Sequence, residues 1–481
     1  MATRVPFPIA KVKGCTVKVK DPMTWPLVTA LVLTAAAPAG NAEGPAPRPP
    51  NVILVVADDL GWGDLASYGH PTIRTPHLDR MAAEGQRWTT FYAAAPYCTP
   101  SRAGLLTGRL PVRSGMASEV RTVLYADSKG GLPASEVTIA DLLKGRGYAT
   151  AHIGKWHLGH LPAYLPQRHG FDLYFGIPYS NDMDAVPDSP DTRIEHPKSE
   201  YFNVPVYRDG AVVERPARQE TITRRYVEES LRFIRANRNR PFFLYLAHTM
   251  PHVPLFAGEG FAGRSPRGAY GDVVEEIDGG MGQLLETLAE TGLDRRTLVI
   301  FTSDNGPWRG QHGLGGSAGP LRDGKGTTFE GGVRVPALFW WPGTVAPGVV
   351  REMGSLLDVL PTLAAVAGVP LPAGRVLDGY DLSPVLRGRG PSPRRTYFYY
   401  RSATLQAVRS GPYKLHFLTR PDGNDEPPRR VDPPWLFDLD QDPGEQYDVA
   451  AERPAIVAEL RRLAAEHRRA VVPVEDQIAK R

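Results

Sequence analysis

A cysteine at the start of a predicted helix is the most reactive group in this sequence. In Tyr97-Cys98-Thr99-Pro100-Ser101-Arg102 the proline suits a first helical turn, and small and apolar residues follow. Cys98 would lie at the helix N-terminus, where free N–H groups and the helix dipole favour an anion. Arg102 follows four residues later on the same face. The arrangement predicts an oxyanion site, although a lone cysteine is often only a small buried apolar side chain.

Oxygen-bearing side chains follow two apolar runs that are typical of buried strands in a parallel sheet. The run Asn51–Ala57 ends in two aspartates, and Thr297–Thr302 leads into Ser303-Asp304-Asn305-Gly306. Open α/β sheets bind ligands at such strand ends, and a set of oxygen ligands suits Ca²⁺ or Mg²⁺ better than Zn²⁺. The aspartate pair has an alternative role as a turn before Gly61. The candidate metal ligands are Asp58, Asp59, Asp304 and Asn305.

A lysine and a histidine follow a third predicted strand, Tyr148–Ile153. They lie in Gly154-Lys155-Trp156-His157-Leu158-Gly159. If the backbone stays extended, Lys155 and His157 point to the same side. The plainer interpretation puts Lys155 in solvent and packs His157 under Trp156.

Three more candidates come later in the chain. His248 and His252 both follow the predicted strand Pro241–Ala247, and either could be structural. Lys325 lies between two glycines, which is common for a flexible surface residue. Only the wider pattern of motifs favours a functional role for these residues.

That pattern resembles the type I, formylglycine-dependent sulfatases, and most of all the arylsulfatase A group. Cys-x-Pro-Ser-Arg is the family signature, and Gly-Lys-Trp-His-x-Gly is a second sulfatase motif. The resemblance runs from about Asn51 to about Ala450. Further matching segments are Leu105–Arg109, Gly176–Ser180 with a serine that faces sulfate in arylsulfatase A, the His-x-Pro of His252, the lysine Lys325, and Trp435–Leu439 with Asp442–Glu445.

The resemblance implies a modification, a reaction and a cofactor. Cys98 would be oxidised to Cα-formylglycine by a formylglycine-generating enzyme. One hydroxyl of the hydrated aldehyde attacks sulfur and expels the alcohol or phenol, and collapse of the hemiacetal then frees sulfate. The family implies Ca²⁺, with Mg²⁺ as the second choice. Residue 98 would join Asp58, Asp59, Asp304 and Asn305 as a metal ligand.

The same resemblance assigns roles to the basic side chains. Lys155 and Lys325 would neutralise sulfate oxygens together with the metal, and Arg102 and His157 would hold the diol. His252 would protonate the leaving oxygen, since imidazole titrates near neutral pH. The predicted catalytic residues are Cys98, Arg102, Lys155, His157, His252 and Lys325, and the predicted substrate-binding residues are Lys155, Ser180, His252 and Lys325.

Two other functions remain open on the sequence. A phosphatase or phosphonate monoester hydrolase of the same superfamily would use the same nucleophile on a different ester. A non-catalytic relative would bind sulfated glycans and leave Cys98 unoxidised. Assays on both esters and the mass of residue 98 separate these alternatives.

The N-terminus predicts export. A basic stretch precedes the apolar run 25–37 and small residues, which is typical of a signal peptide over residues 1–42, followed by a Pro/Gly/Ala linker over residues 43–50. Beyond residue 42 the chain holds 51 basic and 51 acidic residues, so charge does not point to nucleic acid or a membrane surface. With Cys15 in the leader, the mature chain has no internal disulfide. A bacterial periplasmic or secreted enzyme is expected, and its oligomeric state cannot be read.

The elements that must position these residues predict an α/β fold. Apolar strands alternate with amphipathic helices over residues 51–380, as in a large, mostly parallel sheet flanked by helices, and the resemblance implies the alkaline-phosphatase-like sulfatase fold. Residues 182–218 are expected to form surface loops that line the substrate entrance. Residues 381–481 predict a smaller α+β subdomain with an antiparallel sheet. Its expected strands are Tyr397–Tyr400, Leu405–Arg409 and Tyr413–Leu418.

Overall fold

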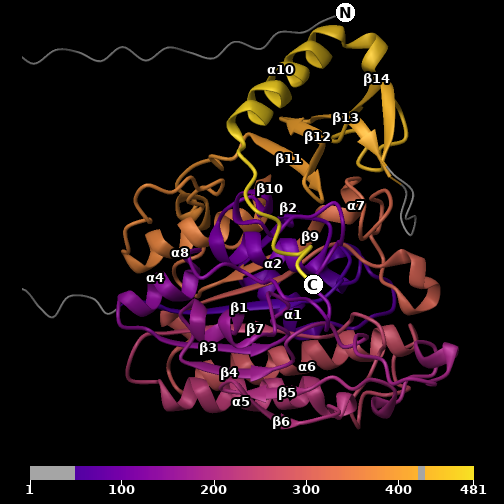
Figure 1. Cartoon of the computed structure of the whole chain (residues 1–481). Coiled ribbons are helices and arrows are strands. Elements are labelled where there is room, and N and C mark those ends of the chain that lie inside the picture. Colours follow the sequence, from indigo (N-terminus) through magenta and orange to yellow (C-terminus); the bar gives the residue numbers. More distant parts are fainter. Residues whose placement is uncertain (1–48, 421–427) are drawn as a thin grey trace, which may run out of the picture. The chain divides into compact units, whose positions relative to one another are not determined.

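The structure, a computed structural model, describes residues 49–420 and 428–481, which lie in a single compact unit (Figure 1). The predicted signal peptide and nearly all of the predicted linker fall outside the described residues. Within the described ranges, no helix has the length and apolar character needed to cross a membrane. The predicted domain boundary near residue 380 stays a prediction.

A ten-stranded sheet forms the centre of the described chain and confirms the predicted α/β class. The strands lie in the order β10 (Gly348–Ser355), β2 (Gln86–Tyr92), β9 (Arg334–Trp340), β8 (Thr297–Ser303), β1 (Asn51–Ala57), β7 (Phe242–Ala247), β3 (Ala149–Gly154), β4 (Leu173–Gly176), β5 (Val206–Arg208) and β6 (Ala211–Glu214). The central strands β8, β1, β7, β3 and β4 are parallel, whereas β9, β5 and β6 pair antiparallel with their neighbours. The central carboxyl ends therefore meet along one edge of the sheet.

Both faces of this sheet are buried, as the side chains of β1 show. Val52, Leu54 and Val56 belong to one apolar core, and Ile53 and Val55 belong to the other. Successive side chains of a strand point to opposite faces, so a strand covered on both sides needs apolar residues at every position. The unbroken apolar run of β1 follows from that requirement.

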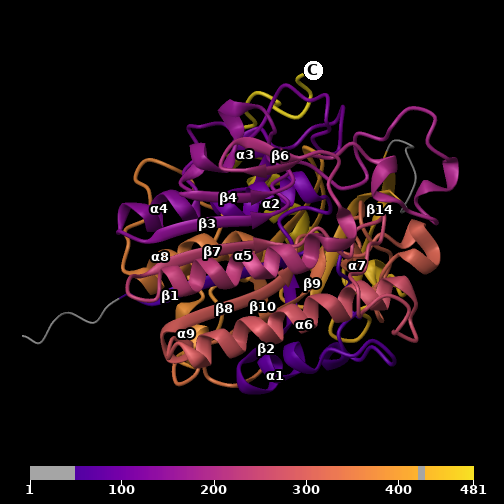
Figure 2. The same cartoon turned by 90° about the horizontal axis from the view of Figure 1, so that it is seen from below.

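Helices cover both faces of the sheet. Their bounds are α1 (Pro76–Glu84), α2 (Cys98–Thr107), α3 (Pro111–Ser114), α4 (Ile139–Gly145), α5 (Ile222–Ala236), α6 (Ala269–Glu290), α7 (Glu330–Val333), α8 (Val359–Ala367), α9 (Ser383–Leu386) and α10 (Pro454–Ala470). Side chains of α2, α4 and α8 join the core on one face, and those of α1, α5 and α6 join the core on the other. Figure 2 shows α5 and α6 side by side over one face of the sheet. Every residue of α2 is buried, which fixes its N-terminus at the strand ends.

A four-stranded antiparallel sheet follows near the C-terminus, as predicted. Its strands lie in the order β11 (Thr396–Arg401), β12 (Thr404–Ser410), β13 (Tyr413–Thr419) and β14 (Arg429–Asp438). Helix α10 packs on β12 and β13 (Figure 1). Leu415 of β13 and Leu460 of α10 share an apolar core with Val52 of β1, so this sheet packs directly on the larger part of the fold.

The structure corrects the prediction for residues 182–218. That segment contains the hairpin β5–β6 as well as loops. All of β6 except its last residue is exposed, and an exposed edge strand needs no apolar periodicity to form. The sequence also did not predict strand β14, because it contains Pro433 and Pro434 and prolines argue against a central strand. In the structure β14 lies at the edge of its sheet, where prolines are tolerated.

Candidate active site

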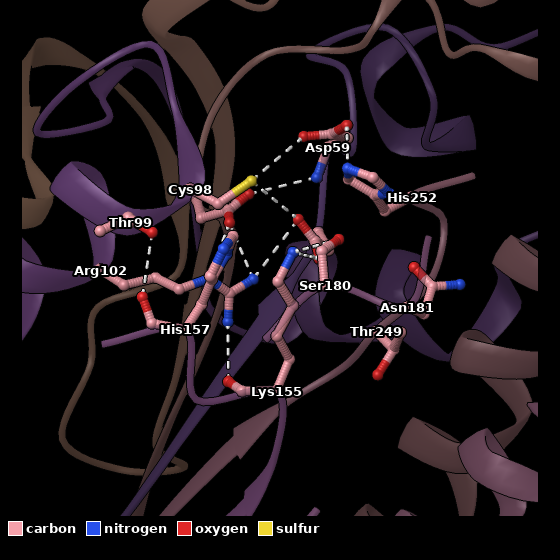
Figure 3. Close-up of polar contacts among 12 residues, drawn as sticks. Asp59, Cys98, Thr99, Arg102, Lys155, His157, Ser180, Asn181, Thr249 and His252 are labelled. Atoms are coloured by element: carbon pink, nitrogen blue, oxygen red, sulfur yellow. Dashed lines mark hydrogen bonds and ion pairs between the residues drawn. The ribbon is translucent and has the colours of Figure 1, made fainter. Parts of the chain in front are cut away.

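The predicted site residues gather where the carboxyl ends of the central strands meet the first turn of α2 (Figure 3). The two aspartates follow β1, Lys155 follows β3, and Asp304 follows β8. Parallel strands bring these chain segments to one edge although they are far apart in sequence. The assembled buried residues are Asp58, Asp59, Cys98, Arg102, Lys155, His157, Ser180, His252, Asp304, Asn305 and Lys325.

Cys98 is the first residue of α2 and faces the aspartate pair. Its Sγ lies 3.4 Å from Asp58 Oδ1 and 3.9 Å from Asp59 Oδ1. Burial raises the pKa of the Cys98 thiol well above its ordinary value, and Lys155 and Lys325 only partly offset that effect. The unmodified thiol is therefore protonated at neutral pH and is a poor nucleophile.

Arg102 reaches the carboxylates from the next turn of α2. Its Nε donates to Asp304 Oδ2 at 2.9 Å, its Nη1 donates to the Lys155 carbonyl at 3.1 Å, and its Nη2 lies 3.5 Å from Asp58 Oδ1. The guanidinium is fully buried, and these carboxylates hold its pKa above the ordinary value despite burial. Arg102 therefore orders the carboxylates beside Cys98.

The two lysines keep part of their hydrogen-bonding capacity unused. Lys155 Nζ lies 2.5 Å from Asp58 Oδ2 and donates to Ser180 Oγ at 3.0 Å. Lys325 Nζ donates to Asp59 Oδ2 at 2.7 Å and lies 4.6 Å from the centre of the Trp308 ring. An ammonium group has three N–H donors, so both lysines can bind a further oxygen. The surface position considered for Lys325 and the solvent position considered for Lys155 are both wrong, because both side chains are buried.

His157 reaches the site through a backbone conformation that the sequence did not indicate. Its φ is 57°, so the assumption of an extended backbone from Lys155 to His157 is wrong. Its Nε2 lies 2.8 Å from the Leu124 carbonyl, and its buried Nδ1 has no partner among the described residues. Trp156 instead packs against His152 and other rings, so the alternative of His157 packed under it is also wrong.

His252 lies beside Asp59 and Trp308. Its Nδ1 is 2.5 Å from the Val253 carbonyl, which fixes Nδ1–H as the donor there, and its Nε2 is 3.7 Å from Asp59 Oδ2. Burial and then Lys325 lower the pKa of His252, while Asp59 opposes the shift. His248, the other candidate on this segment, is buried without a side-chain partner in the described chain and does not line the cavity.

The carboxylates form a set of ligands that fits a cation. One ligand atom from each of Asp58, Asp59, Cys98 and Asp304 lies within 4.8 Å of all the others. Burial and the neighbouring carboxylates raise the pKa of Asp304 to about 6, although Arg102 opposes the shift. Asn305 Nδ2 donates to Asp59 Oδ1 at 2.7 Å, and its buried Oδ1 has no donor among the described residues. Crowded carboxylates beside an unpartnered amide oxygen are the chemistry that a hard divalent cation satisfies.

A cavity of about 280 Å³ opens over Cys98 and contains residues that the sequence did not single out. Besides Cys98, His157, Ser180, His252 and Lys325, it is lined by Tyr97, Asp182, Trp308 and Arg401. Asp182 follows the matched segment that ends at Ser180, and Trp308 follows the one at Asn305, so their proximity to motifs was a usable signal. Arg401 lies on β11, and no local pattern connects that strand with the cavity.

Two family models match this chain, one over the large sheet and one over the C-terminal part. Residues 50–369 match the sulfatase family model, and residues 392–481 match the model of the C-terminal region of aryl-sulfatase. Human arylsulfatase A is 46% identical over 445 residues, which cover 86% of this chain and 87% of the relative.

Two further relatives and one solved structure agree with this assignment. Mouse steryl-sulfatase is 43% identical and covers 94% of this chain and 86% of its own length. Dog N-acetylgalactosamine-6-sulfatase is 40% identical and covers 94% of this chain and 91% of its own length. The PsFucS1 sulfatase from Pseudoalteromonas sp. superposes with a TM-score of 0.78 at 32% identity, over 87% of this chain and 90% of that one.

Proposed function

Because this chain belongs to the sulfatase family and is an arylsulfatase-like enzyme, we propose that it hydrolyses sulfate esters with residue 98 as Cα-formylglycine. The observation that carries the proposal is the place of Cys98, at the N-terminus of buried α2, facing Asp58 and Asp59 and opening into the cavity. A buried thiol with a raised pKa is protonated and therefore a poor nucleophile for attack on sulfur. Oxidation by a formylglycine-generating enzyme supplies a hydrated aldehyde, whose one hydroxyl attacks sulfur and whose other loses its proton as sulfate leaves.

The lysines bind the sulfate group. Lys155 and Lys325 neutralise Asp58 and Asp59, and each retains at least one unused N–H donor. Lys325 also lines the cavity. These ammonium groups donate to sulfate oxygens, where negative charge is concentrated in the transition state. Ser180 keeps Lys155 in place through its Oγ.

His252 protonates the leaving oxygen. With Nδ1–H held by the Val253 carbonyl, the acid is the doubly protonated ring, and the proton that it transfers is the one on Nε2. Asp59, whose Oδ2 lies 3.7 Å from Nε2, favours that charged form. Trp308 packs against the His252 ring at 5.5 Å between ring centres and limits its rotation. Arg102 and the unpartnered Nδ1 of His157 hold and orient the hydroxyl groups of residue 98.

Asp58, Asp59, Asp304, Asn305 and residue 98 hold the metal ion. The donor set favours Ca²⁺, with Mg²⁺ as the second choice, because all the side-chain ligands offer oxygen once residue 98 is modified. The bound ion stabilises negative charge on the oxygen of residue 98. Arg102 contacts both Asp304 and Asp58, and all three side chains are buried. These contacts restrict the rotation of the two carboxylates, so the ligand set is preorganised.

The test combines mass and activity on one sample. The protein is co-expressed with a formylglycine-generating enzyme, and the peptide containing residue 98 is analysed by mass spectrometry. The value of kcat/KM is then measured on nitrophenyl sulfate, nitrophenyl phosphate and a phenylphosphonate monoester. We expect the aldehyde and a preference for sulfate. A preference for either phosphorus ester would favour the superfamily hydrolases, and an unmodified, inactive protein that binds sulfated glycans would favour a binding role. The N-terminal peptide from the native host tests the proposed export and removal of residues 1–42.

A further inference from the structure

Two charged groups in the cavity wall take no part in the reaction described above. They are Asp182, which follows Ser180 by two residues, and Arg401 on β11. The cavity also has an aromatic wall, formed by Tyr97 and Trp308 among others. These groups lie outside the sulfate and metal ligands, where the alcohol part of the ester must lie.

Asp182 is a carboxylate without a donor. Among the described residues, neither of its oxygens accepts a hydrogen bond, and Oδ1 is also shielded from water. A carboxylate left unpaired away from water costs free energy, so such groups normally have partners. A hydroxyl group from a molecule in the cavity would supply a donor to Oδ2, the oxygen that is not shielded.

Arg401 is a cation without a carboxylate. Its Nε donates to the Gly326 carbonyl and its Nη2 donates to Tyr97 Oη at 2.7 Å, so its orientation is fixed by neighbours of Lys325 and Cys98. Within residues 49–420 and 428–481, no carboxylate lies within ion-pair distance of it, and only 5% of the residue is exposed. Burial lowers the pKa of Arg401, and Tyr97 and the more distant Glu119 offset only part of that effect. Its remaining N–H groups are free to donate to an oxygen in the cavity.

We propose that Asp182 and Arg401 form the subsite for the leaving alcohol, and that this alcohol is a sugar whose ring hydroxyls pair with both groups. This inference rests on the proposed sulfatase function. A hydroxyl group donates to the carboxylate and another accepts from the guanidinium, whereas a purely anionic group would satisfy Arg401 and be repelled by Asp182. Tyr97 and Trp308 add aromatic surface to the cavity wall, and such surface can pack against the C–H groups of a sugar ring.

An apolar leaving alcohol does not fit this wall. A steroid or plain aryl ring would displace water from Asp182 and Arg401 without replacing the hydrogen bonds that water makes to them. Each polar group left unpaired costs about 1–3 kcal/mol, and a charged group costs more. Sites built to pair with hydroxyl groups reject analogues that lack them, because the polar groups of the site remain unpaired. The cavity therefore selects for hydroxyl groups on the alcohol as well as for sulfate.

The experiment compares esters that differ only in hydroxyl groups. A panel of hexose and N-acetylhexosamine sulfates is assayed, and the best of them is paired with cyclohexylmethyl or cyclohexyl sulfate that has the same type of ester carbon. Both members of a pair need a proton on a similarly basic alkoxide, so any indirect effect of Asp182 on His252 cancels. We expect the wild type to prefer the sugar ester by at least about a hundredfold in kcat/KM.

The variants are Asp182→Asn and Arg401→Gln, with Asp188→Asn and Arg430→Gln as matched controls. Asp188 is exposed on the same segment as Asp182, Arg430 is exposed on β14, and neither lines the cavity. We expect each subsite variant to reduce the preference for the sugar ester about ten- to a hundredfold, because hydrogen bonds to charged groups contribute about 1.5–3 kcal/mol. The controls should keep the wild-type preference, and thermal unfolding of every variant shows that it is folded.

The outcomes separate this inference from the function on which it rests. Equal losses on both members of a pair would mean that Asp182 or Arg401 only supports the site, and would overturn the inference. A wild type that cleaves nitrophenyl sulfate but does not distinguish the sugar from the cyclohexyl ester would also overturn it, while the sulfatase proposal stands. If protein with oxidised residue 98 cleaves no sulfate ester, both proposals fall.

Discussion

Lys155 and Lys414 are both fully buried lysines that contact carboxylates, yet one lies in the active site and the other in a structural cluster. Lys414 Nζ uses all three donors, on the Thr328 carbonyl, Glu330 Oε1 and Glu445 Oε1, at 2.7, 3.0 and 2.8 Å. Lys155 uses two. The spare donor of Lys155 is what makes it suitable for binding a substrate oxygen.

The same difference extends to the carboxylates around each lysine. Every carboxylate oxygen of Glu330 and Glu445 accepts a hydrogen bond, from Tyr92, Tyr399, Lys414, His416 or the Glu330 backbone. This Glu330 cluster lines no part of the cavity over Cys98, and Nδ1 of His416 is its one side-chain atom without a partner in the described chain. At the active site, Asn305 Oδ1 and His157 Nδ1 are unpartnered and the cavity is adjacent. The Glu330 cluster therefore has no carboxylate oxygen left for a ligand, whereas the groups beside Cys98 can still bind one.

Four changes test this comparison, ordered by their expected effect on turnover. The largest belongs to Cys98→Ser. Serine offers one hydroxyl, so it can accept sulfate once but cannot release it by collapse to an aldehyde, and sustained turnover should fall by at least about 10⁴-fold. Steady-state turnover and the mass of residue 98 measure this. Multiple turnovers by the serine variant would remove residue 98 from the proposed role.

The metal should come next. Chelation should abolish activity, and Ca²⁺ or Mg²⁺ should restore it better than Zn²⁺. Asp304→Ala should lose both metal and rate, by about a hundred- to a thousandfold, since a bound cation is worth several kcal/mol of transition-state charge stabilisation. Elemental analysis of the purified variant reports metal content independently of rate. Wild-type metal content in Asp304→Ala would show that the ligand set is wrong.

His252→Ala tests the leaving-group acid. A poor leaving group needs a proton in the transition state and nitrophenolate does not, so the loss on an alkyl or sugar sulfate should exceed that on nitrophenyl sulfate by about a hundredfold or more. Lys325→Ala is the matched comparison, because it contacts the sulfate common to all esters and should reduce both rates alike. Equal losses for His252→Ala on the two esters would reassign His252 to sulfate binding.

The smallest effect on turnover is expected from Lys414→Met, although its effect on stability is large. The substitution removes the ammonium group that pairs with the buried carboxylates of Glu330 and Glu445. Leaving these charges buried without it should lower the free energy of unfolding by about 3–5 kcal/mol. Burial would raise the pKa of Glu330, but Lys414 and Arg409 outweigh it and hold that pKa at about 2. The carboxylate is charged in both states above about pH 4.5, and its contribution is lost as pH falls toward 2.

The free energies of unfolding of wild type and variant should therefore converge as pH falls through that window, measured by denaturant titration at several pH values. Lys480→Met, which removes an exposed ion pair with Glu475, is the control and should unfold like the wild type at every pH. If Lys414→Met retained wild-type stability but lost turnover, the distinction between the two clusters would be wrong.

The sequence alone predicted the fold class, and it named the candidate residues that the structure brings together around Cys98. Continuous apolar runs predicted β1, β7 and β8 to within a residue, because strands buried on both faces need apolar side chains throughout. Asp58 and Asp59 follow β1 directly, and Asp304 and Asn305 follow β8, so the convergence of these four candidates at one edge was expected from the parallel pairing of the sheet. Every predicted site residue is in the buried set around Cys98.

Only the tertiary structure decided which other side chains complete the cavity and which buried charges are structural. Arg401 reaches the cavity from β11, and Glu330 meets Lys414 and Glu445 from segments far apart in the chain. Such contacts are set by how two sheets pack, and no local periodicity encodes them. The left-handed backbone of His157 is likewise imposed by its surroundings. Spacing identifies groups that can react, whereas packing decides which of them keep an unpaired donor or acceptor.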